Sequence, residues 1–243
     1  MHHPAQQIRF CTSRDNVRIA YATCGAGPPL VWAQHWVHNL KHDWDSPVWR
    51  PWLSTLMQRH MLIRYDLRGC GLSDRERVDF SFEKLVEDFE AVIEATGLKR
   101  FAFIGMAIGT AIGMTYAVRH PERITHLILY ASYTRNRLAG EPTTDQVDEV
   151  QARLKVMELG WPNDNPAYGQ FFTSLHIPDA TVEQACAHND LLRVTTSSAN
   201  AVDLMRMMLG IDVHEVVPRV RCPTLVLHRP LIESIFILLT SAN

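Results

Sequence analysis

The feature that most constrains the fold of this chain is a pair of glycines, Gly105 and Gly109, placed between an apolar run and a helical pattern. The run Phe101 to Ile104 predicts a buried strand, and Thr110 to His120 predicts a helix. Because glycine has no Cβ, the two glycines allow a tight turn from strand to helix and a close approach of neighbouring backbone. Such a turn lifts its central side chain above the sheet, and here that residue is Ala107.

Short apolar runs alternate with helical patterns along most of the chain. Such alternation implies right-handed crossovers and a mostly parallel sheet with helices on both faces, so the predicted fold class is α/β. The further predicted strands are Ile8 to Cys11, Val17 to Ala22, Leu30 to Ala33, Met61 to Tyr65, Ile124 to Ala131 and Pro223 to His228. The further predicted helices are Pro51 to Arg59 and Phe82 to a C-cap at Gly97.

Residues 134–217 depart from this alternation, because polar and acidic helical stretches follow one another without a strand. We expect them to form a helical lid over the sheet. The predicted core domain is then made of residues 1–133 and 218–243.

Composition narrows the expected partners and location. A length of 243 residues with 47% hydrophobic content fits one main domain, and a net charge of −2 gives no reason to expect nucleic acid or a membrane surface as partner. Five scattered cysteines without a C-x-x-C pair indicate reduced thiols and a cytoplasmic location. The N-terminus lacks a signal-peptide pattern and no apolar stretch is long enough to span a membrane, so neither secretion nor membrane insertion is expected.

Four motifs in this order resemble the α/β-hydrolase superfamily. They are Tyr65-Asp66-x-Arg68-Gly69-x-Gly71-x-Ser73, the turn Gly105-Met106-Ala107-Ile108-Gly109, His120-Pro121-Glu122-Arg123-Ile124 and Cys222-Pro223-Thr224-Leu225-Val226-Leu227. Residues 8–15 and 43–49 further resemble a bacterial subgroup whose hydrolase-like domains occur alone or joined to cyclase or helix-turn-helix regulator domains. The resemblance covers about residues 8–228 and implies an α/β-hydrolase fold of the serine hydrolase type.

The resemblance also implies a site, which this chain matches only in part. The turn should carry a nucleophile, but Ala107 has only a methyl group and cannot attack a carbonyl. The backbone N–H of Ile108 is expected to form an oxyanion hole, with a second donor near Gln34 or His35. The residues expected to line the pocket are Trp36, Met106 and Ser132.

The other two members of a catalytic triad are not recognisable. Glu233 is the one carboxylate close after the strand Thr224 to His228, and no histidine follows His228. We therefore expect the last strand and helix of the fold to be missing and the chain to be inactive as an esterase, since triad members act as a unit.

Several residues have an ordinary interpretation beside a functional one. His35, His38 and His42 could bind a metal ion, although a loop role is the simpler interpretation, and no metal or cofactor is expected. Cys70 could act as a nucleophile, but no histidine is evidently placed to activate it. Asp66 and Arg68 are expected to form an ion pair that fixes their loop. The tryptophans between Trp32 and Trp52 either pack the first helix on the sheet or line a pocket.

Three functions remain open at this point. The first is a carboxylic ester hydrolase type of protein, present here in an inactive form. The second is a non-catalytic module that binds or senses a small apolar or ester-like ligand. The third is chemistry without a nucleophile at the turn, in which an oxyanion hole and a repositioned histidine act on the substrate. A homodimer is also left open.

Overall fold

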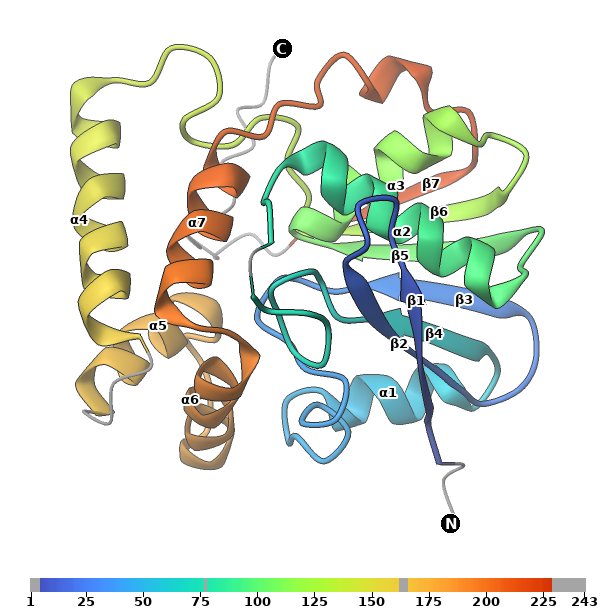
Figure 1. The fold of residues 1–243 in the computed structure, drawn as a ribbon, viewed down its shortest axis with the longest axis horizontal. Coiled ribbons are helices and arrows are strands. Elements are labelled where there is room, and N and C mark those ends of the chain that lie inside the picture. The colour runs from blue at the N-terminus through green and yellow to red at the C-terminus, as the bar shows by residue number, and fades with distance from the viewer. Residues whose placement is uncertain (1–4, 77, 162–165, 229–243) are drawn as a thin grey trace.

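The computed structural model describes residues 5–76, 78–161 and 166–228. Its centre is a seven-stranded sheet in the order β1-β2-β4-β3-β5-β6-β7 (Figure 1). The strands from β4 to β7 in this order are parallel, whereas β2 is antiparallel to both β1 and β4. The strands are β1 (Gln7–Thr12), β2 (Arg18–Cys24), β3 (Pro29–Ala33), β4 (Met61–Tyr65), β5 (Phe101–Met106), β6 (Ile124–Tyr130) and β7 (Thr224–Leu227).

Three helices cover the two faces of this sheet. Helix α1 (Arg50–Met57) lies on one face, and α2 (Phe82–Thr96) and α3 (Ile108–Arg119) lie together on the other (Figure 1). In α2 the side chain of Ser81 accepts the N–H of Lys84, and Gly97 ends the helix with φ 68°, as its position in the sequence predicts. The predicted α/β class, with a mostly parallel sheet and helices on both of its faces, is confirmed.

Four helices form an insertion between β6 and β7, drawn to one side of the sheet in Figure 1. They are α4 (Thr144–Gly160), α5 (Pro166–His176), α6 (Val182–Thr195) and α7 (Ser198–Leu209), followed by the 3₁₀ turn η1 (Val217–Arg219). Thr143 and Thr181 each begin a helix with a reciprocal capping box, which explains why these polar stretches are helical. We call residues 144–209 the helical insertion.

Backbone hydrogen bonds join the two segments that flank the helical insertion. The N–H of Val213 donates to the carbonyl of Thr134 at 2.7 Å, and the N–H of Asn136 donates to the carbonyl of Ile211 at 2.9 Å. The bridge between Arg135 and Asp212 lies in the same ladder. The insertion therefore leaves and re-enters the sheet layer at one place, which fixes its base beside the carboxyl end of β6.

The predicted ion pair between Asp66 and Arg68 is wrong. Arg68 is fully buried and donates two hydrogen bonds of 2.7 Å to Asp88, from Nε and Nη2, while Nη1 and Nη2 also donate to Asp15. Asp66 instead accepts the N–H groups of Leu40 and Leu72. Asp66 and Arg68 therefore take part in separate hydrogen-bond networks.

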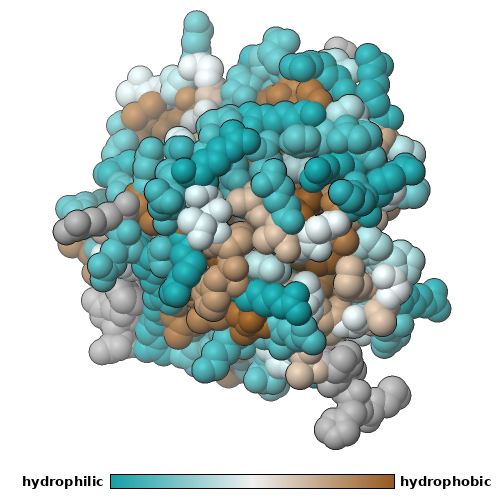
Figure 2. Space-filling view, turned by 45° about the vertical axis from the view of Figure 1, so that its right-hand side comes forward, coloured by the Kyte–Doolittle hydropathy of each residue, from teal (hydrophilic) through white to brown (hydrophobic). Residues whose placement is uncertain are grey.

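A helix that spans a membrane must be long and predominantly apolar. Figure 2 shows one face, on which hydrophilic side chains predominate and hydrophobic side chains are visible in small groups. No helix within residues 5–76, 78–161 and 166–228 is long and apolar enough to cross a bilayer.

Candidate functional site

The turn between β5 and α3 has the strained geometry that its glycines predict. Ala107 has φ 50° and ψ −115°, a conformation that residues with a Cβ rarely adopt. A Cβ on Gly105 would lie 2.6 Å from the carbonyl oxygen of Gly109, and one on Gly109 would lie 2.1 Å from that of Ala33. The N–H of Ala107 donates to the carbonyl of Tyr130 at 3.1 Å, which holds the turn against β6.

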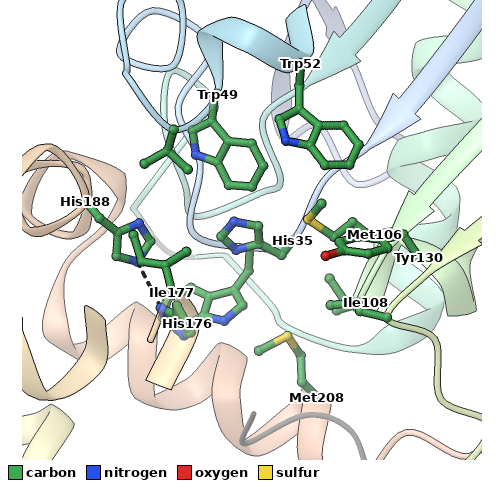
Figure 3. A pocket seen from close by; sticks show the side chains of 14 residues that line it. His35, Trp49, Trp52, Met106, Ile108, Tyr130, His176, Ile177, His188 and Met208 are labelled. Carbon is green, nitrogen blue, oxygen red and sulfur yellow. Dashed lines mark hydrogen bonds between the residues drawn. The ribbon is translucent and has the colours of Figure 1, made fainter. Parts of the chain in front are cut away.

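A cavity of about 190 Å³ lies over this turn, between the sheet and the helical insertion (Figure 3). Its wall combines residues from the core with residues from α5, α6 and α7, and none of the lining residues is acidic, lysine or arginine. The lining residues are His35, Trp36, Val48, Trp49, Trp52, Met106, Ala107, Ile108, Tyr130, Ala131, His176, Ile177, His188 and Met208.

The structure brings together five of the residues singled out in the sequence. Ala107 and Ile108 are part of the cavity wall, and so are Met106, His35 and Trp36. Ile108 is the first residue of α3, so its backbone N–H has no partner within the helix. A donor at this place could bind a ligand oxygen held above Ala107.

Three other predicted site residues are placed elsewhere. The side chain of Gln34 is buried below the loop, where it donates to Asp43 and accepts from Arg64, both at 3.2 Å. Ser132 is one residue beyond the lining residue Ala131 and is not part of the described wall. Glu233, like the apolar run that follows it, is outside the described residues.

The buried charges near Gln34 fix the loop that follows β3. Arg64, on β4, binds Asp43 at 3.2 Å and also the carbonyl of Leu40 at 3.3 Å. His38 lies 3.2 Å from Asp66 through its Nδ1. His38 and Asp43 therefore stabilise the loop. The described part of the chain contains no group of side chains arranged to bind a metal ion.

Cys70 is not arranged as a nucleophile. It is fully buried, and burial together with the nearby Asp66 carboxylate raises the pKa of its thiol to about 12. A thiol with such a pKa stays protonated at neutral pH, whereas the thiolate is the attacking form.

Three histidine rings meet on one side of the cavity. His176, at the end of α5, and His188, on α6, are joined by a hydrogen bond of 3.0 Å between Nδ1 and Nε2. Burial lowers the pKa of His176 to about 4 and that of His188 to about 3, so both rings are neutral at pH 7. The ring of His35 lies 6.2 Å from that of His176, and burial likewise lowers its pKa well below the usual value.

The sequence predicts a helical lid over the sheet but does not identify the residues that the insertion contributes to the wall, namely His176, Ile177, His188 and Met208. These residues carry no motif, and each is distant in sequence from Ala107. Only the packing of the insertion over the turn brings them to the cavity.

Known proteins are similar to this chain in both sequence and fold. A family model described as alpha/beta hydrolase fold matches residues 33–160. A protein of Azorhizobium caulinodans provisionally named carbamate hydrolase RutD is 36% identical over 117 residues, which are 48% of this chain and 42% of that protein. The cis-3-alkyl-4-alkyloxetan-2-one decarboxylase of Shewanella oneidensis is 33% identical over 125 residues, or 50% of this chain and 37% of that protein. The aligned region thus spans less than half the length of these curated relatives.

Solved structures match over most of the chain. A hydrolase from Pseudomonas aeruginosa PA01 has a TM-score of 0.73 at 20% identity, covering 94% of this chain and 83% of that one. An esterase from Exiguobacterium antarcticum also has a TM-score of 0.73, at 22% identity, covering 89% and 79%. At this level of identity the likeness concerns the fold alone.

Proposed function

The chain belongs to the alpha/beta hydrolase fold family, and we propose that it is a member of the carboxylic ester hydrolase type that binds small apolar or ester-like ligands without hydrolysing them. The observation that carries this proposal is the position of Ala107. Its methyl group lies in the cavity wall at the strained strand-to-helix turn, where covalent chemistry would require a hydroxyl or thiol.

The rest of the cavity is suited to holding a carbonyl compound. The N–H of Ile108 provides a hydrogen-bond donor beside Ala107, and tryptophan, methionine and tyrosine side chains supply apolar walls. The names of the two curated relatives, a carbamate hydrolase and an oxetan-2-one decarboxylase, both refer to carbonyl compounds. We infer that the carbonyl oxygen of the ligand lies at the Ile108 N–H.

The alternative is a non-catalytic sensory module on the same fold. It is favoured by the contribution of both the core and the helical insertion to the cavity, because a ligand between them would bias their relative position. In either case we place the protein in the cytoplasm, a proposal supported by its five free cysteines.

Hydrolysis and binding measured side by side test the proposal. We expect no turnover of short-chain aryl esters above a mock preparation, together with saturable binding of aryl ketones, which cannot be hydrolysed. Ala107→Ser is expected to add little activity, because a serine needs a paired base. Ala107→Gly is its matched control without a hydroxyl.

The outcomes separate the alternatives. Turnover by the unchanged chain would overturn the proposal, and folded protein that binds none of the ketones would overturn the ligand-binding part. Turnover by Ala107→Ser alone would favour the hydrolase type over the sensory module, since a working base would then remain.

A further inference from the structure

The cavity has two sides of different chemistry (Figure 3). Trp52, Met106 and Ile108 make one side apolar, next to Ala107. The other side is formed by the rings of His35, His176 and His188. An apolar ligand would fill the first side and leave the buried Nδ1 of His188, on the second side, without a hydrogen-bond partner among the described residues.

The ring nitrogen of His35 that can donate a hydrogen bond is fixed by the contacts of the ring. Its Nδ1 accepts the backbone N–H of Val37 at 3.1 Å, so Nδ1 must carry the lone pair. In the neutral ring the proton is therefore on Nε2. The ring is packed against Trp49, with 5.1 Å between ring centroids, which restricts its rotation.

His188 carries a buried nitrogen without a partner. The residue is only 2% exposed, and its Nε2 is used in the bond to His176. Its Nδ1 has no hydrogen-bond partner among the described residues. A buried polar atom without a hydrogen bond is unfavourable, so a ligand that supplies this bond gains affinity.

Resting on the proposed function, we propose that His35 and His188 bind an uncharged hydroxyl group of the ligand, so that the pocket selects hydroxylated aryl or alkyl carbonyl compounds. A hydroxyl accepts from His35 Nε2–H, and it can either donate to or accept from His188 Nδ1. A carboxylate is disfavoured, because no lysine or arginine belongs to the described wall and an unpaired buried charge is costly. The neutral state of the histidines agrees with this choice.

A set of ketones tests the selectivity without interference from turnover. Acetophenone is the parent, the three hydroxyacetophenone isomers carry the hydroxyl at different positions, and 4-acetylbenzoate carries a carboxylate. By isothermal titration calorimetry we expect the best hydroxylated isomer to bind about 3- to 10-fold more tightly than the parent, as one or two net hydrogen bonds would give. The carboxylate is expected to bind more weakly than the parent.

Variants assign the preference to the histidines. His35→Phe and His188→Phe should each reduce the preference for the hydroxylated ketone over acetophenone to within about twofold, whereas His188→Gln should retain part of that preference. His126→Phe changes an exposed histidine on β6 and should keep the full preference. Circular dichroism confirms that each variant is folded.

The failure of this inference is distinguishable from that of the proposed function. Equal binding of parent and hydroxylated ketones by the unchanged chain, or a preference that survives both phenylalanine variants, would overturn the selectivity. Absence of binding for every ketone would overturn the proposed function, and this inference with it.

Discussion

Gly109 lies so close to Ala33 that a Cβ at position 109 would be 2.1 Å from the Ala33 carbonyl oxygen. This contact joins the first turn of α3 to the end of β3. It places the Ile108 N–H, which follows the turn, beside the loop that carries His35. The two core elements that provide polar groups to the cavity are thus held together by a glycine.

Gly109→Ala should destabilise the protein by about 1–3 kcal/mol, the usual cost of forcing extra atoms into a packed site. The obstacle is a backbone oxygen that cannot rotate away, and it outweighs the better helix propensity of alanine. Urea unfolding measures the change. Gly210→Ala is the matched control, because its nearest neighbouring atom would be 3.6 Å away, and it should change stability by less than about 0.5 kcal/mol. Equal stability of both variants would contradict the close contact.

Ala107→Gly is expected to stabilise the protein, against the usual effect of such a change. A non-glycine residue at φ 50° and ψ −115° carries strain of about 1–3 kcal/mol, and glycine relieves it at an entropic cost of about 0.5–1 kcal/mol. A net gain of about 1 kcal/mol should appear as a higher midpoint in urea. Ala111→Gly, in the regular part of α3, should instead lose about 1 kcal/mol or more. A loss in both variants would show that position 107 is not strained.

Arg68 pairs with two carboxylates, so replacing it should lower the free energy of unfolding. Arg68→Met leaves the fully buried Asp88, and Asp15 beside it, without their cation, which is expected to cost about 3–5 kcal/mol. Arg206→Met breaks an exposed pair with Asp203 on α7 and should cost less than about 1 kcal/mol. The comparison uses urea unfolding at pH 7. Similar small losses in both variants would mean that water reaches Asp88 when Arg68 is absent.

Local patterns were sufficient to predict the sheet, the crossover helices and the turn at Ala107. These features depend on residues close in sequence, such as Gly97 at the end of α2 and the glycines on either side of Ala107. The predicted and observed strands differ by at most two residues at either end, and the bounds of β4 are the same.

Side-chain partners across elements could not be predicted in this way. Arg68 pairs with Asp88 and Asp15, distant in sequence, rather than with its near neighbour Asp66. Gln34 turns below its loop because Arg64 and Asp43 are there to bind it. His176 and His188 reach the cavity only because the helical insertion packs over the turn. The apolar pattern along a helix does not say where that helix packs on the sheet.

The histidine pair of the insertion should make stability fall in mild acid. Because burial lowers the pKa of His176 to about 4 and of His188 to about 3, the unfolded chain binds protons that the folded chain does not. Their stabilising contribution is complete above the unfolded pKa near 6.5 and decreases as the pH falls below it. Each histidine contributes a slope of about 1.4 kcal/mol per pH unit toward its folded pKa. Urea unfolding between pH 6.5 and 5 should therefore show a smaller slope for His188→Gln than for the unchanged chain, while His126→Gln should keep the original slope. The same slope in all three proteins would mean that water, rather than packed side chains, surrounds His188.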